Sequence, residues 1–188
     1  PIVVGHSLGG LVAQHLAAEG RVLGAVYVSS PGPFGIAPTL WNLSWNSPNV
    51  LAALILAQVG AGSFLGINQI RAALFGADTP DDWIRDVTPL PAPEAPSVLV
   101  DAMTWDLPAW PLLRRTPSLA LLGDCDAFVP VSEQWSMAAF CGAETDVLRG
   151  LGHGAPIDPA WRSLAWRINA WIDERRLSEA ASDQRRLC

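Results

Sequence analysis

The chain has no lysine, and only three histidines, three cysteines and one tyrosine occur among its 188 residues. Twelve basic residues, all of them arginine, stand against 18 acidic ones, so the formal net charge is −6. Such an acidic chain is a poor partner for nucleic acid, where affinity depends on cations that neutralise phosphates. Three cysteines without CxxC or Cys/His spacing exclude a disulfide scaffold and give no zinc motif.

Charged residues are also scarce, at 16% of the chain, while 50% of residues are hydrophobic. This composition excludes a disordered chain, and the length predicts one domain. We expect free thiols at Cys125, Cys141 and Cys188 and a cytoplasmic location. Because the chain opens at Pro1 without an initiator methionine or a signal peptide, we expect its native N-terminus, with any targeting signal, to be missing.

A long uncharged stretch, residues 22–70, raises the question of a membrane span. Residues 50–70 are long enough to cross a bilayer. They also contain Gln58, Asn68, Gln69 and three glycines, which weaken both helix formation and insertion. We therefore favour a buried or lid helix here over an integral membrane span.

Short apolar runs alternate with helical patterns toward both ends of the chain. Strands are predicted at residues 1–4, 22–29, 118–123 and 143–148, and helices at residues 8–19 and 132–141. The clearest helix has Asp158 as N-cap and Pro159 at its first position. Its apolar stripe consists of Trp161, Leu164, Ala165, Ile168, Trp171 and Ile172. Strands that alternate with helices predict an α/β architecture with a parallel sheet.

Residues 31–115 interrupt this alternation and hold 11 of the 16 prolines and five of the nine tryptophans. We interpret them as a mostly helical insertion, with the proline-rich residues 89–96 as a hinge or connector. A surface loop this apolar would be insoluble, so the insertion is expected to cover something. The predicted organisation is a core of residues 1–30 and 116–177, the insertion, and a polar tail of residues 178–188.

Residues 5–10, Gly-His-Ser-Leu-Gly-Gly, match the GxSxG nucleophile elbow. The pattern is weak alone, but a strand before it and a helix after it supply the context that the elbow requires. We expect the turn to strain the backbone of Ser7, and side chains at Gly5 and Gly9 to collide with it. Gly10 would let the helix pack close to the sheet. The alternative is a tight turn with an inert serine.

A serine nucleophile needs a base, which is itself oriented by an acid. His153 lies in a glycine-rich loop after the fourth predicted strand, where it can swing over a strand end. His6 adjoins Ser7, but neighbouring side chains on such a turn are expected to point apart. His15 lies two helical turns further on, against the sheet or solvent. The sequence therefore favours His153 as the base.

The acid is expected between the serine and the histidine, in the chain order that follows a nucleophile elbow. Asp124 and Asp126 directly follow the third predicted strand. We favour Asp126, which lies further into the loop and can turn toward His153. Asp124, the alternative, is expected to bond local backbone amides. Asp101 and Asp106 belong to the insertion and are poorer candidates.

Three segments together resemble the C-terminal portion of an α/β-hydrolase fold protein: GHSLGG at 5–10, GDCDAFVP at 123–130 and GLGHGAPID at 150–158. The resemblance implies the last four strands of a parallel sheet with flanking helices, and it implies that the insertion is a cap domain.

The same resemblance implies Ser7 as nucleophile, Asp126 as acid and His153 as base. It implies an oxyanion hole with the N–H of Leu8 as one donor and a second donor from an earlier strand that this sequence does not contain. Because that donor is absent and the strand at residues 1–4 would lack a neighbour, we expect residues 1–188 alone to be inactive and to associate.

The implied function is a serine hydrolase that cleaves a carboxylic ester or related acyl bond of a small, apolar substrate. Haloalkane dehalogenation and epoxide hydrolysis are disfavoured, since in this family they use an aspartate where Ser7 stands. The alternative is a non-catalytic ligand-binding or receptor-like protein of the same fold. No metal or nucleotide motif is visible, so we expect no cofactor.

An apolar substrate is expected because the uncharged stretch would cover Ser7. Its large apolar side chains are Trp41, Trp45, Leu51, Leu54, Ile55 and Phe64. Such a lining offers no ion partner to a charged acyl group. An arginine that reached the pocket, from Arg71, Arg114 or Arg115, would reverse this expectation.

Overall fold

The computed structural model describes residues 1–87, 95–103, 108 and 110–175. Within them, parallel strands form one sheet in the order β1-β2-β3-β4. The strands are β1 (Ile2–His6), β2 (Gly24–Val28), β3 (Ser118–Gly123) and β4 (Glu144–Leu148). All four were predicted, and β3 has the predicted bounds. β1 begins one residue later and ends two residues later than predicted. β2 begins two residues later and ends one earlier, and β4 begins one residue later, because apolar character continues beyond the paired residues.

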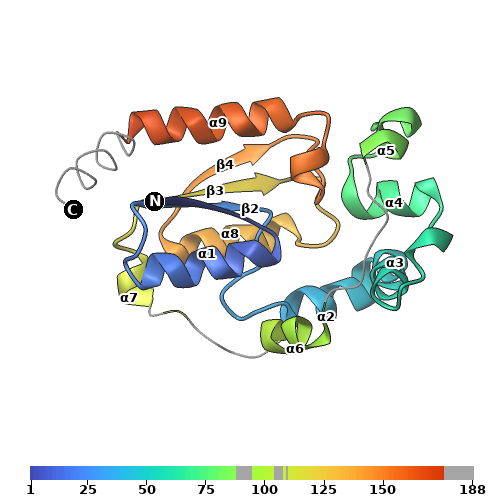
Figure 1. Cartoon of the computed structure of the whole chain (residues 1–188), viewed down its shortest axis with the longest axis horizontal. Helices are drawn as coiled ribbons and strands as arrows, with labels where there is room; N and C mark the ends of the chain where they lie inside the picture. The colour runs from blue at the N-terminus through green and yellow to red at the C-terminus, as the bar shows by residue number, and fades with distance from the viewer. Residues whose placement is uncertain (88–94, 104–107, 109, 176–188) are drawn as a thin grey trace.

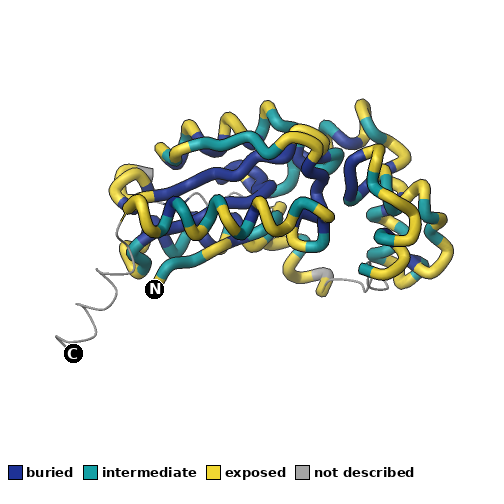
Figure 2. Tube along the Cα trace, turned by 90° about the horizontal axis from the view of Figure 1, so that it is seen from above, coloured by how far each residue is buried: buried dark blue, intermediate teal, exposed yellow. Residues whose placement is uncertain are grey.

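Helices cover both faces of the sheet (Figure 1). On one face lie α1 (Leu8–Ala18) and α8 (Val131–Cys141), and on the other lies α9 (Trp161–Glu174). Every residue of β2 and β3 is buried, and Figure 2 shows these strands as the buried layer between helices. Because side chains alternate along a strand, Tyr27 and Leu122 pack toward α1 and α8, while Val28 and Leu121 pack with Trp171 of α9.

The start of the last helix differs from the prediction. Helix α9 begins at Trp161 with Ala160 as N-cap, so Asp158 is not the cap and Pro159 is not its first residue. Asp158 instead forms a turn just before the helix. Its Oδ1 accepts the N–H of Ala160 at 2.8 Å, and its backbone oxygen accepts the N–H of Trp161 at 3.0 Å. The Asp158-Pro159 pair therefore forms the turn that precedes helix α9, rather than its first residues.

The chain between β2 and β3 is mostly helical, as predicted. Its helices are α2 (Ala37–Asn46), α3 (Pro48–Gln58), η1 (Gly62–Phe64), α4 (Ile67–Leu74), α5 (Asp81–Val87), α6 (Pro96–Met103) and α7 (Trp110–Leu113). Helices α2 to α5 gather beyond the carboxyl ends of the strands (Figure 1). Leu43, Val50 and Ala73 form a small core there, against which Phe128 of the β3–α8 loop packs. These helices are thereby joined to the sheet domain.

The uncharged residues 50–70 are divided among α3, η1 and α4. None of the helices in the described part of the chain is long and apolar enough to cross a membrane. Residues 89–94 of the proline-rich connector lie outside the described residues, and Pro96 is the first residue of α6. The polar tail at residues 178–188 lies wholly outside them.

Candidate active site

The turn between β1 and α1 places Ser7 at the carboxyl edge of the sheet. Ser7 has φ 51° and ψ −124°, a conformation that is costly for any residue with a side chain. Its N–H donates to the carbonyl of Val28 at 3.0 Å, which ties the strained turn to β2. The strain predicted for this serine is therefore present.

Two of the three glycines in the motif are required by close contacts. A Cβ at Gly5 would lie 2.3 Å from the carbonyl oxygen of Gly9, and one at Gly10 would lie 2.1 Å from the hydroxyl of Ser30. A Cβ at Gly9 would meet nothing within 4 Å. The expectation that a side chain at Gly9 would collide with the turn is therefore wrong. Gly10 packs against the segment after β2, and this contact brings α1 close to the sheet.

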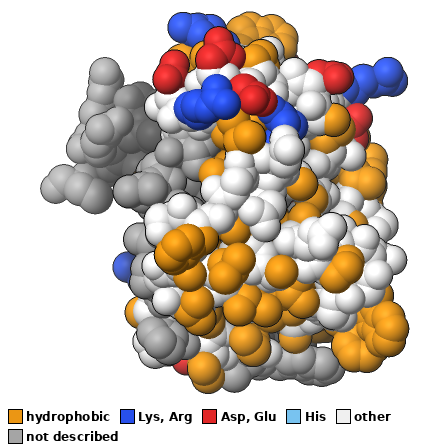
Figure 3. Space-filling view, turned by 90° about the vertical axis from the view of Figure 1, so that its right-hand side faces the viewer, with side chains coloured by type: hydrophobic (Ala, Val, Ile, Leu, Met, Phe, Trp, Pro, Cys, Tyr) orange, Lys and Arg blue, Asp and Glu red, His pale blue; other side chains and the backbone are white. Residues whose placement is uncertain are grey.

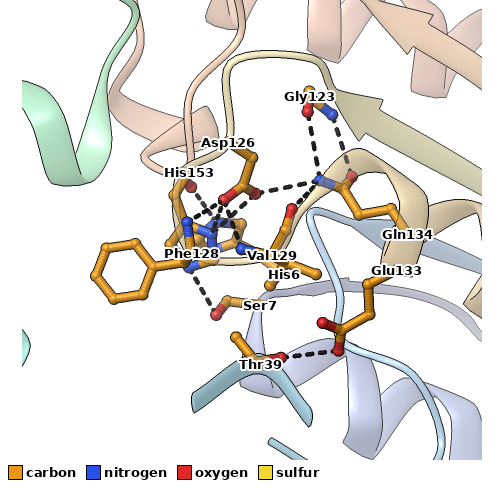
Figure 4. A network of polar contacts seen from close by, with 10 residues as sticks. All are labelled: His6, Ser7, Thr39, Gly123, Asp126, Phe128, Val129, Glu133, Gln134 and His153. Carbon is orange, nitrogen blue, oxygen red and sulfur yellow. Dashed lines mark hydrogen bonds and ion pairs between the residues drawn. The ribbon is translucent and has the colours of Figure 1, made fainter. Parts of the chain in front are cut away.

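The structure brings Ser7, Asp126 and His153 together in one hydrogen-bonded chain (Figure 4). The Nε2 atom of His153 lies 2.8 Å from the hydroxyl oxygen of Ser7. Its Nδ1 atom lies 3.0 Å from each carboxylate oxygen of Asp126. An ionised carboxylate only accepts, so Nδ1 carries a proton and Nε2 of the neutral ring is left to accept the serine proton.

The carboxylate of Asp126 is fully buried, and buried charge requires hydrogen-bond partners. Besides His153, its Oδ1 accepts the backbone N–H groups of Phe128 and Val129, each at 2.9 Å. These local bonds hold the carboxylate in one orientation. Asp124 was expected to accept hydrogen bonds from local backbone amides, but it is Asp126 that accepts them.

Asp124 has a different role from the one predicted. Its Oδ1 accepts the N–H of Gly150, 26 residues away, at 2.6 Å. The carboxylate therefore joins the loop after β3 to the loop that carries His153. Sequence reasoning missed this contact because it links two loops that are distant in the chain.

Gln134 of α8 is a further residue of the site that sequence reasoning missed. It is fully buried, and its Oε1 accepts the N–H of Gly123 at 3.1 Å. Its Nε2 lies 2.7 Å from the carbonyl oxygen of Val129 and 3.4 Å from Oδ2 of Asp126. Gln134 therefore braces the loop that carries the acid. The available signal was an amide at helical spacing from Met137, Ala138 and Cys141, the apolar residues of the buried face of α8.

His6 does not point away from the site, contrary to the prediction. Its Nε2 lies 2.7 Å from the backbone oxygen of His153, and the two ring centroids are 5.2 Å apart. Burial, followed by the proximity of His153, lowers the pKa of His6. His15 lies elsewhere, beside a cavity between α1 and α6 that Leu11, Val12 and Ala102 help to line.

A cavity of about 210 Å³ opens next to Ser7 and His153. Phe128 forms one wall and stacks on the His153 ring, with centroids 4.6 Å apart. The other lining residues are Leu8, Pro31, Ile36, Thr39, Leu40, Leu43, Leu54, Leu99 and Val129. Apart from Ser7, Thr39 and His153, the lining side chains are apolar, as in most small-molecule pockets.

Thr39 lines this cavity, and a hydrogen bond to helix α8 holds its hydroxyl group. Its Oγ1 donates to Oε1 of Glu133 on α8 at 2.8 Å (Figure 4). Burial raises the pKa of Glu133. This bond connects α2 to the sheet domain beside the cavity.

Most of the large apolar residues expected to line the site face solvent instead. The exposed fractions are 69% for Trp41, 71% for Trp45, 54% for Ile55 and 83% for Phe64. Leu51 packs against the small core described above, and Leu54 alone of the six lines the cavity. Figure 3 shows hydrophobic side chains spread over this side of the molecule. Ile55 lies on α3, which is apolar on all sides and so gives no sequence signal for its buried face. In α2 the buried residues are Thr39 and Leu43, while Trp41 and Trp45 are exposed.

The three arginines that could have reached the cavity lie elsewhere. Arg71 pairs with Asp81 and donates to the carbonyl of Thr79. Arg114 donates to the carbonyl of Ala139, and Arg115 is exposed beside it. None of them lines the cavity next to Ser7.

The N–H of Leu8, expected to serve an oxyanion, opens helix α1 directly after Ser7. The first amides of a helix have no acceptor within the helix, so this N–H can point to a ligand. Leu8 also lines the cavity.

Neither of the two described cysteines lines the cavity beside Ser7. Cys125 is exposed and Cys141 is buried, both as free thiols, and burial raises the pKa of Cys141 to about 12. Cys188 lies outside the described residues. Across the ranges that the structure describes, no group of three or more histidine, cysteine or acidic residues could hold a metal ion.

Several solved structures resemble this fold. A protein assigned as a non-heme bromoperoxidase from Mycobacterium tuberculosis matches with a TM-score of 0.65 and 19% identity over 92% of this chain. An esterase from Thermogutta terrifontis matches with 0.63 and 20% over 92%, and a monoacylglycerol lipase from Paleococcus ferrophilus with 0.56 and 22% over 92%. The chain spans 66%, 64% and 67% of these three proteins, respectively. At these identities the likeness shows the fold.

A comparison with curated protein sequences finds no significant match. A family model described as "Alpha/beta hydrolase family" matches residues 1–165, which is most of the chain. The motifs at the elbow, the acid loop and the histidine loop all lie within that match. The chain therefore belongs to the alpha/beta hydrolase family.

Proposed function

We propose that this protein is a serine hydrolase that cleaves a carboxylic ester or related acyl bond of a small, apolar substrate. The observation that carries the proposal is the hydrogen-bonded chain from Ser7 through His153 to the buried Asp126, at the mouth of an apolar cavity. Family membership supports a hydrolase, and the neighbouring solved structures include an esterase and a lipase.

In the proposed mechanism, the Ser7 hydroxyl attacks the substrate carbonyl while Nε2 of His153 takes its proton. Asp126 stays ionised and stabilises the imidazolium that forms. The oxyanion of the tetrahedral intermediate accepts the N–H of Leu8. His153 then gives its proton to the departing alcohol, which leaves an acyl group on Ser7. Water activated by His153 attacks this acyl-enzyme, releases the acid and restores the serine.

The helices between β2 and β3 would act as the cap of this site. Leu40, Leu43 and Leu54 from α2 and α3 contribute to the cavity wall, while Thr39 supplies a hydroxyl beside it. Each substrate methylene buried against this wall is favourable by about 0.8 kcal/mol. An unpaired carboxylate buried there would be costly. Residues 31–115 are accordingly proposed as the cap, and residues 1–30 and 116–177 as the catalytic core.

Hydrolysis of p-nitrophenyl esters by the natural gene product tests this function. We expect an initial burst of p-nitrophenol equal to the enzyme concentration, followed by a slower steady state, since an acyl-enzyme accumulates. Ser7→Ala should abolish both phases. A protein that binds the ester without turnover would instead be the non-catalytic, receptor-like member of the family that the sequence leaves open.

A further inference from the structure

We propose that His6 is a positioning residue: its Nε2–H holds the backbone carbonyl of His153 and thereby sets the place of the catalytic imidazole. This inference rests on the proposed role of His153. It assigns a function to a histidine that takes no part in the proton transfers. The two residues are 147 positions apart in the chain, and the bond between them is 2.7 Å.

The two ends of this bond differ in rigidity. His6 is the last residue of β1, and its backbone is in register with Val28 of the buried strand β2. His153 lies in the connection between β4 and the short helix η2 (Ala155–Ile157). The sheet is therefore the fixed partner, and the loop is the segment that is held.

The same loop is tied down at neighbouring positions by other parts of the molecule. Gly150 donates to Asp124, and Leu151 accepts the N–H of Cys125 at 3.1 Å. Gly154 donates to the carbonyl of Leu74 in α4 at 2.6 Å. These bonds fix the two flanks of the loop, whereas the bond from His6 acts on the backbone of His153 itself.

The proton on His6 follows from its partner. A carbonyl oxygen only accepts, so Nε2 of His6 must carry a proton, and the neutral ring keeps Nδ1 unprotonated. Burial lowers the pKa of His6 most and the proximity of His153 lowers it further, while the hydrogen bond to the His153 backbone and the charge of Asp126 raise it by less. The net direction is downward, so the neutral ring is favoured. A neutral donor is suitable here, because a positive charge 5.2 Å from the His153 ring would oppose the imidazolium that the reaction needs.

Replacement of His6 by glutamine and by phenylalanine tests the proposal. A glutamine amide can donate to the same carbonyl without titrating, while phenylalanine keeps the ring volume and loses the donor. In the natural gene product we expect His6→Phe to lower kcat about 10- to 100-fold with little change in KM, and His6→Gln to keep most of the rate. Should His6→Phe fail to fold, the apolar His6→Met takes its place.

A spectroscopic readout separates this proposal from the proposed function. The His153 Nδ1 proton, bonded to Asp126, should give a low-field proton resonance, assigned by its loss in His153→Gln. We expect this resonance in the wild type and in His6→Gln, and its broadening or loss in His6→Phe, even if the protein hydrolyses no ester. Equal rates and equal resonances in all three proteins would overturn the proposal. The proposal would also be overturned if His6→Gln and His6→Phe lost rate and resonance to the same extent and a lower melting temperature accounted for both losses.

Discussion

At the scale of single residues, two aspartates that sit two positions apart have separate roles. Asp126 contacts the imidazole, and Asp124 contacts a backbone amide of the histidine loop. We expect Asp126→Asn to lower kcat by about 10³- to 10⁴-fold, because an amide does not hold His153 in the required tautomer. Ser7→Ala and His153→Ala should be still more damaging.

Asp124→Asn is the matched control, since it retains an oxygen that can accept the N–H of Gly150. Its kcat should stay within a few-fold of the wild type. Kinetics of the four variants with one ester check the assignment. A larger loss in Asp124→Asn than in Asp126→Asn would make Asp124 the acid.

The buried amide of Gln134 should contribute to stability as well as to placement of the acid. Gln134→Leu leaves the N–H of Gly123 and the carbonyl of Val129 without their partner in a buried setting. Each unsatisfied group costs about 1–3 kcal/mol, so we expect unfolding free energy to fall by at least that amount. Urea denaturation measures this change. Ser136→Ala, an exposed change on the same helix, should alter stability by no more than about 0.5 kcal/mol.

At the scale of elements, the elbow glycines differ in a way that adjacent substitutions can measure. Gly10→Ala would drive a Cβ into Ser30, and overpacking of this kind costs about 1–3 kcal/mol. Gly9→Ala meets open space within α1 and should be neutral or stabilising by up to about 1 kcal/mol, because alanine favours helix more than glycine does. Thermal unfolding of both variants tests the contrast, and equal destabilisation would contradict it.

The helices around the cavity lead to a prediction about substrate charge. We expect kcat/KM to rise along a series of neutral p-nitrophenyl esters until the cavity is full, and to be lower for a matched ester that bears a carboxylate. The reason is that the cavity wall is apolar and Arg71 is already paired with Asp81. A preference for the charged ester would mean that a cation reaches the site.

The sequence predicted where the helices and strands lie along the chain better than it predicted which side of each helix is buried. The strands were identified because short apolar runs alternate with helices. The chain order of serine, aspartate and histidine, each just after a strand, predicted which side chains meet. The orientation of α3 could not be predicted because apolar side chains lie all around it, and that of α2 could not because Thr39 is buried while Trp41 and Trp45 face solvent. The contacts of His6 and Asp124 were missed because each partner lies in a loop distant in sequence, so they depend on how the loops fold back over the sheet edge.

At the scale of the whole molecule, β1 lies at an edge of the sheet in the described structure. One side of an edge strand presents unpaired backbone groups, and Val4 within it is 50% exposed. We expect the 188-residue chain to self-associate, and Val4→Lys to reduce this association by placing charge on the strand. Val12→Lys, a similar change at a 59% exposed position of α1, is the control. Light scattering after size-exclusion chromatography measures the effect, and a monodisperse wild-type monomer would contradict it.

The assignment of Ser7 as an activated nucleophile is tested most directly by reaction of the natural gene product with a fluorophosphonate, followed by peptide mass spectrometry. We predict one stoichiometric adduct, located on Ser7, that forms much more slowly in His153→Gln. An unmodified Ser7 in a folded protein, or equal labelling rates with and without His153, would contradict the proposed hydrolase mechanism.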